Sequence, residues 1–111
     1  MSAQPPSLFD LAEFDGRTIG LLLIAGRELR NAQAKFAPFN SPHEGKAVIE
    51  EELDELWDLV KANNGADAEA FWEAIQVAAM ALRYAYDLTT LSAWEVAEAH
   101  SITAAVKGAH V

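Results

Sequence analysis

The chain has 111 residues, which is enough for one domain with a hydrophobic core but not for two. Hydrophobic residues make up 51% of it, which disfavours disorder, and the formal net charge of -9 disfavours binding to nucleic-acid polymers or anionic membranes. Cysteine is absent, which excludes disulfides, thiolate metal sites and a cysteine nucleophile.

No targeting or membrane segment is expected. The first six residues, Met1–Pro6, lack the basic and apolar regions of a secretory signal peptide. The longest apolar stretch, residues 19–26, is too short to span a bilayer as a helix. We therefore expect a cytoplasmic protein that contacts neither a membrane nor a nucleic-acid polymer.

Apolar residues recur mostly at helical spacing, and no segment predicts a strand. A short helical segment is expected at residues 8–14, and a first long helix at about 18–36. The apolar face of this long helix would be formed by Ile19, Leu22, Leu23, Gly26, Leu29 and either Ala32 or Gln33. Pro38 disfavours helix in the residue before it, so residues 37–40 should form a loop.

The start of a second helix is well marked. Ser41 can act as its N-cap, Pro42 suits the first helical position, and Glu44 completes a capping box. These residues predict a helix at about 42–62. The Asn-Asn-Gly run at 63–65 should end it.

Two further helices are expected in the second half of the chain. Asp67 can cap a third helix at about 68–88, and Ser92 with Glu95 forms a second capping box, which opens a fourth helix at about 93–107. The connections are short, so neighbouring helices should pack antiparallel. The sequence therefore predicts one all-α domain spanning the whole chain, folded as an antiparallel four-helix bundle.

The segment 68–88 is apolar around most of its circumference. Its polar residues share one narrow stripe: Glu69, Glu73, Gln76, Arg83 and Asp87. A helix this apolar in a small bundle has more apolar surface than one chain can cover. We therefore expect self-association, as a homodimer or a tetramer.

Two carboxylates of the second helix have an unusual position. Glu52 falls inside the apolar arc of that helix, and Glu55 lies at the edge of the arc. An unpaired carboxylate facing a core is costly, so it would protonate or find a partner. Glu73 and Gln76 form a second i, i+3 pair, which a helical hairpin could bring opposite the first. Three carboxylates and an amide oxygen suit Mg²⁺ or Mn²⁺ rather than zinc.

Three stretches carry a family resemblance: residues 39–45 (FNSPHEG), 47–57 (AVIEEELDELW) and 76–83 (QVAAMALR). They resemble phage- and prophage-type MazG-like proteins, which belong to the all-α nucleoside triphosphate pyrophosphohydrolase superfamily. The superfamily motif is E-E-x-x-E, a spacer, then E-x-x-D. Residues 51–55 match its first half fully, and residues 73–76 match its second half with Gln in place of Asp.

The resemblance implies Mg²⁺-dependent hydrolysis of a nucleoside triphosphate to the monophosphate and pyrophosphate by a dimer or tetramer, with Mn²⁺ as a second suitable cation. By position, the metal ligands would be Glu52, Glu55, Glu73 and Gln76. Water would attack the α-phosphorus, with Glu51 or Glu55 as general base. Because Gln is neutral and a weaker ligand than Asp, the alternative is a catalytically silent MazG-like oligomer that acts as a binding or assembly module.

Four further residues are candidates for contact with substrate phosphates: Lys35, His43, Lys46 and Arg83. Each also has a structural interpretation. Arg83 could pair with Asp87 at i+4 instead of with a phosphate. Lys46 or Lys61 could pair with Glu52 and Glu55 if both of those carboxylates faced water.

Overall fold

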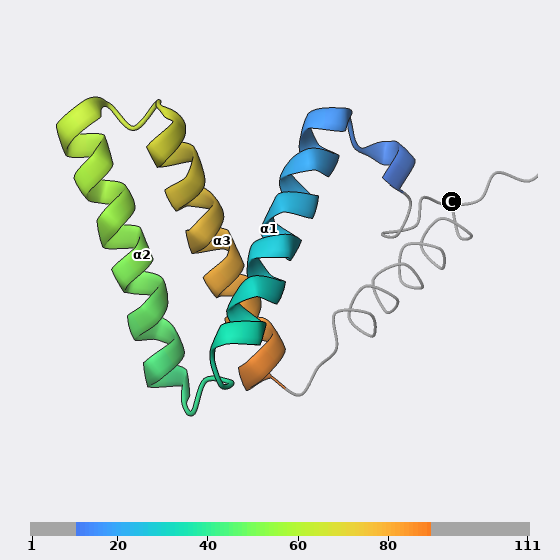
Figure 1. Cartoon of the computed structure of the whole chain (residues 1–111), viewed down its shortest axis with the longest axis vertical. Helices are drawn as coiled ribbons and strands as arrows, with labels where there is room; N and C mark the ends of the chain where they lie inside the picture. Colours follow the sequence, from blue (N-terminus) through green and yellow to red (C-terminus); the bar gives the residue numbers. More distant parts are fainter. Residues whose placement is uncertain (1–10, 90–111) are drawn as a thin grey trace, which may run out of the picture. The chain divides into compact units, whose positions relative to one another are not determined.

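The computed structural model of the chain describes residues 11–89, and this range contains only helices and their connections (Figure 1). A 3-10 turn at Leu11–Glu13 precedes α1 (Gly16–Lys35), α2 (Pro42–Asn63) and α3 (Ala68–Leu88). The expected all-α class is confirmed for the described residues, which contain no strand.

Each long helix begins and ends close to its predicted position, and the third matches residues 68–88 at both ends. Of the short segment expected at 8–14, the described part is the 3-10 turn. The fourth helix predicted at 93–107 lies outside the described residues. Among the described residues, 20–89 form one compact unit.

The predicted start of α2 is present with one change in its hydrogen bonds. Ser41 has extended backbone angles (φ -157°, ψ 158°), and its hydroxyl oxygen accepts a hydrogen bond from the Glu44 backbone N–H at 3.1 Å. The Glu44 carboxylate accepts from the backbone N–H of Asn40 at 3.2 Å. A capping box would direct that bond to Ser41, so the cap here reaches one residue further into the loop.

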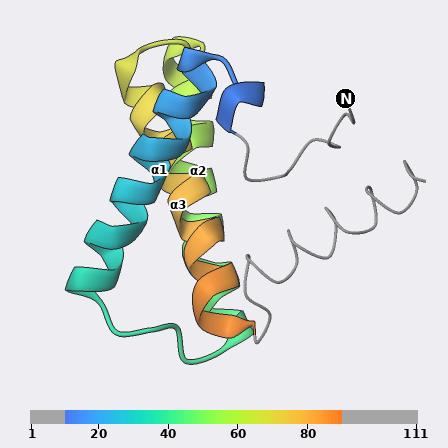
Figure 2. The same cartoon turned by 90° about the vertical axis from the view of Figure 1, so that its right-hand side faces the viewer.

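A short turn joins α2 to α3. Asn64 ends α2 in the left-handed region (φ 67°), and its N–H donates to the Val60 carbonyl at 3.0 Å. Gly65 follows at φ 71°, a conformation that glycine adopts without strain. Asp67 then caps α3 by accepting a hydrogen bond from the Ala70 N–H at 3.0 Å. The two helices consequently run antiparallel and side by side in both views (Figures 1 and 2).

The interior of residues 20–89 is built largely from small side chains. Within the described range, four of the seven buried hydrophobic residues are alanines: Ala25, Ala32, Ala70 and Ala79. Ala32 of α1 meets Ala79 and Met80 of α3, and Val48 and Ile49 of α2 pack against this cluster. α1 therefore meets α3 at the small side chain of Ala32, whereas α2 and α3 are the helices that pack along one another.

Several large apolar side chains of α2 and α3 lie exposed. On α2 these are Leu53, Trp57 and Val60, and on α3 they are Phe71, Trp72, Leu82 and Tyr86. No helix within residues 11–89 is long and apolar enough to cross a membrane.

Gly45 lies where α2 comes close to side chains of α3, and it gives a test of this packing. A Cβ atom at position 45 would lie 2.7 Å from Tyr84 Cδ2 and 2.8 Å from Leu88 Cδ1. We expect Gly45→Ala to lower the free energy of unfolding by about 1–3 kcal/mol, because both side chains must shift. Chemical denaturation followed by circular dichroism measures this.

Gly26→Ala is the matched control for Gly45→Ala. Gly26 also lies inside a helix, but a Cβ atom there meets nothing within 4 Å. The control should stabilise the protein by about 0.5–1 kcal/mol, since alanine has the higher helix propensity. Equal effects at the two positions would contradict the close contact at Gly45.

Candidate metal centre

Three carboxylates converge between α2 and α3. Glu52 and Glu55 occupy neighbouring positions on one face of α2, and the antiparallel hairpin places Glu73 of α3 opposite them. One carboxylate oxygen from each of the three residues lies within 4.8 Å of the other two. Glu52 and Glu73 are half-buried, whereas Glu55 is exposed. This spacing suits hard oxygen ligands around one divalent cation.

One oxygen of this acidic cluster has no partner. Glu73 Oε2 is buried and has no hydrogen-bond donor within reach. A buried acceptor left unsatisfied carries a desolvation penalty of about 1–3 kcal/mol. A proton or a cation would remove that penalty, so the orphaned oxygen fits a divalent ion at this place.

The same crowding changes the protonation of Glu73. Burial is the largest cause, and hydrogen bonds and charge repulsion from Glu52 and Glu55 add to it; together they raise the pKa of Glu73 to about 8. Those hydrogen bonds require Glu73 to carry the proton and donate it. When all three residues are ionised, Oε2 is the orphaned acceptor. Both observations therefore show an acidic cluster that needs positive charge or a proton.

The raised pKa predicts that stability without metal falls as the pH rises. The ordinary pKa of 4.5 applies in the unfolded chain, so between pH 4.5 and about 8 the folded state holds more protons. The free energy of unfolding should drop across this window by about 1–2 kcal/mol, allowing for solvent screening of a half-exposed cluster. Urea denaturation in EDTA at pH 5 and at pH 8.5 measures the drop.

Glu73→Gln should flatten this pH dependence, because glutamine has no proton to lose. Asp54→Asn should leave it in place, since Asp54 is an exposed carboxylate of the same hairpin. A wild-type profile that stays level or rises from pH 5 to 8.5 would show that Glu73 ionises normally.

A cavity of about 600 Å³ adjoins the acidic cluster at Glu52. It is bounded by the end of α1, by the loop at residues 36–41, and by facing parts of α2 and α3. Its lining includes the acidic residues Glu28, Glu44, Glu51 and Glu52, the basic residues Lys35 and Arg83, and the aromatic residues Phe36 and Phe39. The cavity is large enough for a small polar molecule with a hydrophobic part.

Gln76 lines this cavity but is engaged by a residue of α1. Its Nε2 atom donates a hydrogen bond of 2.9 Å to Glu28 Oε2. Glu28 is half-buried and lines the same cavity. The sequence reasoning missed Glu28, although it is the only acidic residue of α1 and lies in helical register with the buried Ala25 and Ala32.

Arg83 is buried and pairs with Asp87, which was one of the two interpretations that the sequence left open. Its Nε atom lies 3.6 Å from Asp87 Oδ2, and the exposed fractions of the two side chains are 7% and 5%. Its Nη2 atom donates to the Ala37 carbonyl at 2.9 Å, and its guanidinium carbon stands 3.9 Å from the centre of the Phe39 ring. Asp87 also accepts from the Phe39 N–H at 3.0 Å. Arg83 thus fastens the loop at residues 36–41 to α3.

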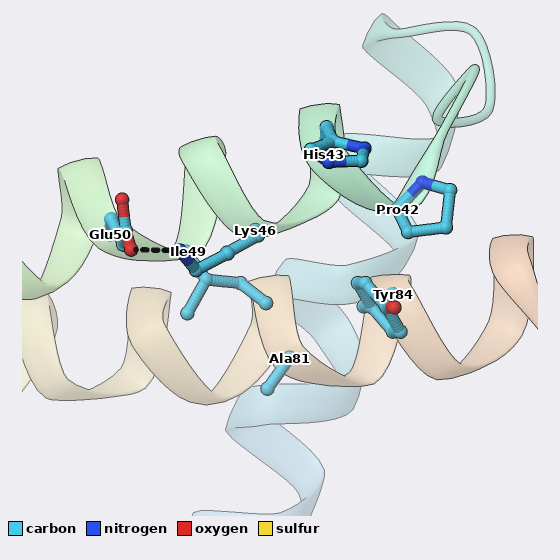
Figure 3. Close-up of a pocket in the computed structure, with 7 residues that line it drawn as sticks. All are labelled: Pro42, His43, Lys46, Ile49, Glu50, Ala81 and Tyr84. Carbon is cyan, nitrogen blue, oxygen red and sulfur yellow. Dashed lines mark ion pairs between the residues drawn. The ribbon is translucent and has the colours of Figure 1, made fainter.

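The four candidates for phosphate contact divide between two cavities. Lys35 and Arg83 line the cavity beside Glu52. His43 and Lys46 line another cavity of about 530 Å³, whose walls include Ile49, Ala81 and Tyr84 (Figure 3). None of the three carboxylates of the acidic cluster lines this second cavity, so the structure does not bring the four candidates together.

The ion pairs of the described residues leave Glu52 and Glu55 without a lysine. Lys46 pairs with Glu50 at 3.1 Å, as the dashed line in Figure 3 marks, and Lys61 pairs with Asp58 at 3.4 Å. Both pairs are exposed. The alternative in which these lysines neutralise Glu52 and Glu55 is therefore not seen within residues 11–89.

Searches with this chain against protein-family models, curated proteins and solved structures find no match.

Proposed function

We propose that the chain is a Mg²⁺- or Mn²⁺-dependent nucleoside triphosphate pyrophosphohydrolase of the MazG-like type, acting on nucleotides in the cytoplasm. The observation that carries the proposal is the convergence of Glu52, Glu55 and Glu73, with one orphaned oxygen, at the edge of a cavity of about 600 Å³. The proposal includes a four-helix bundle completed by residues 93–107 and a homodimer or tetramer.

In this proposal, different residues of the chain would bind the cation and accept the proton from water. Glu52, Glu55 and Glu73 would hold the cation, with Gln76 as a weaker fourth position. A bound divalent ion would neutralise charge on phosphoryl oxygens and make water more acidic. Glu51 is exposed and lines the cavity, so it is better placed than Glu55 to accept a proton from water.

The bond changes balance without any further reactant. The water oxygen would bond to the α-phosphorus as its proton passes to the Glu51 carboxylate, and the oxygen bridging the α- and β-phosphorus atoms would leave with pyrophosphate. Lys35, at the same cavity, would offset phosphate charge in a protein of net charge -9. Arg83 would contribute mainly by holding the cavity wall, because Asp87 and Ala37 already engage it.

A catalytically silent helical oligomer is the second candidate function. Two observations favour it: Gln76 supplies no carboxylate, and large apolar side chains of α2 and α3 lie exposed, among them Trp57 and Leu82. Such a protein would use the apolar surface for assembly and would not need a cation.

One set of measurements separates the two functions. Purified protein is incubated with a panel of nucleoside triphosphates and Mg²⁺ or Mn²⁺, and pyrophosphate release is measured alongside light scattering. Release that requires the cation supports the hydrolase. An oligomer that releases no pyrophosphate from any triphosphate and takes up no metal in calorimetry supports the silent module instead.

A further inference from the structure

Glu28 is hydrogen-bonded to Gln76, the residue at which the chain departs from the motif. The motif has acidic residues at all four positions expected to be metal ligands, whereas this chain has Glu52, Glu55, Glu73 and the neutral Gln76 there. The side chain of Gln76 is held by Glu28, whose Oε2 accepts its amide hydrogen at 2.9 Å. A carboxylate therefore lies within one hydrogen bond of the position where the motif has Asp.

Glu28 and Glu52 also face a common space. Both line the cavity of about 600 Å³, together with Gln76. Glu28 is half-buried and has no basic ion-pair partner among the described residues. Its carboxylate therefore lies at the cavity wall, where it accepts a hydrogen bond from the amide of Gln76.

We propose that Glu28 of α1 is the fourth acidic residue of the metal centre, with Gln76 positioning its carboxylate. This inference rests on the proposed cation site. It restores the four negative charges that the motif would place at its ligand positions, and it makes α1 part of the centre. The charge that Asp would carry on α3 is supplied from a different helix.

Glu28 would act on the cation through water. It is not one of the three residues whose oxygens lie within 4.8 Å of one another, so direct ligation beside Glu52, Glu55 and Glu73 is not indicated. Magnesium and manganese keep several water ligands in such sites, and a carboxylate that accepts hydrogen bonds from those waters strengthens binding. Loss of an outer partner of this kind typically lowers metal affinity about 10–100-fold.

The test is Mn²⁺ binding by isothermal titration calorimetry with full-length variants. Glu28→Gln removes the charge but keeps an oxygen that can accept from Gln76, so the fold is retained. It should weaken Mn²⁺ binding about 10-fold or more. Asp54→Asn removes the same charge from an exposed position on α2 and should change affinity less than about 2-fold.

A double variant that exchanges the two side chains tests whether Mn²⁺ affinity can be restored. Glu28→Gln/Gln76→Glu swaps amide and carboxylate across one hydrogen bond and should recover wild-type affinity to within about 3-fold. If Glu28→Gln binds Mn²⁺ as Asp54→Asn does, the role of Glu28 is refuted while the metal centre stands. If the wild-type protein takes up no Mn²⁺, both the centre and this inference fail.

Discussion

Glu52→Gln is expected to abolish divalent-cation binding and any hydrolysis that depends on it. Glu52 is the residue that the acidic cluster and the adjoining cavity share. The substitution keeps the size of the side chain but removes a charged ligand. The loss of Mn²⁺ affinity should exceed about 100-fold, beyond the 10–100-fold expected for a group that acts only through water.

The variant should also become more stable than wild type when metal is removed. Removing the Glu52 charge takes away one of the causes that raise the pKa of Glu73, so less repulsion remains above pH 8. Loss of binding together with a higher melting temperature in EDTA at pH 8.5 separates this result from misfolding. Glu50→Gln is the control, because Glu50 is an exposed neighbour paired with Lys46. Wild-type Mn²⁺ affinity in Glu52→Gln would show that the acidic cluster holds no cation.

Arg83→Met should produce the largest loss of stability. Arg83 and Asp87 are almost fully buried, and the substitution leaves the Asp87 charge without a cation. It also leaves the Ala37 carbonyl without its donor and removes the contact with the Phe39 ring. Breaking a buried pair by removing one partner costs about 3–5 kcal/mol, which approaches the whole stability of a small domain.

The comparison for Arg83→Met is Lys46→Met, which breaks the exposed Lys46–Glu50 pair. Side chains in that pair are 75% and 57% exposed, so the loss should stay below about 1 kcal/mol. Arg83→Met/Asp87→Leu removes both charges and should recover part of the stability. Denaturant titrations of the three variants measure their free energies of unfolding. Equal losses for Arg83→Met and Lys46→Met would mean that the Arg83–Asp87 pair is open to water.

Structure is easiest to predict from the sequence where a residue type has one well-defined local role, such as capping a helix. Ser41 and Asp67 mark helix starts because their side chains satisfy the backbone N–H groups of a first turn, and both do so here. The i, i+3 spacing of Glu52 and Glu55 likewise places both carboxylates on one helix face. Those local rules were enough to predict α2 and α3. That Glu73 lies opposite Glu52 and Glu55 also required the expected hairpin between the two helices.

The face of α1 could not be predicted in the same way. Residues 21–24 read Leu-Leu-Leu-Ile, a run that is apolar in every direction, so the phase of the helix is ambiguous. The predicted face included Leu22 and Leu23, but these are 52% and 68% exposed. Ala32, one of the two residues proposed for the end of that face, is buried, and so is Ala25, which was not predicted. The buried side of α1 is the side on which Ala32 meets Ala79 and Met80 of α3. The sequence did not indicate that Glu28 shares this side and reaches Gln76.

Long-range contacts to the backbone were the second limit. The two interpretations of Arg83 were a contact with a substrate phosphate and an ion pair with Asp87. Neither included the hydrogen bond to the Ala37 carbonyl, 46 residues away, because no local pattern encodes it. The hydrogen bond from the Phe39 N–H to Asp87 was equally out of reach of local patterns. The fold makes both contacts by bringing the loop at residues 36–41 against the last two turns of α3.

The alanine-rich interior has a consequence for the lifetime of the protein. Methyl groups remove little apolar area from water, so the helices of residues 20–89 gain little from hydrophobic burial. A divalent ion bound as proposed, at 100 times its dissociation constant, would add about 2.7 kcal/mol, a large share of the stability of a small domain. Resistance to proteolysis would then rise and fall with divalent-ion supply, and the amount of intact protein would follow the occupancy of its acidic centre.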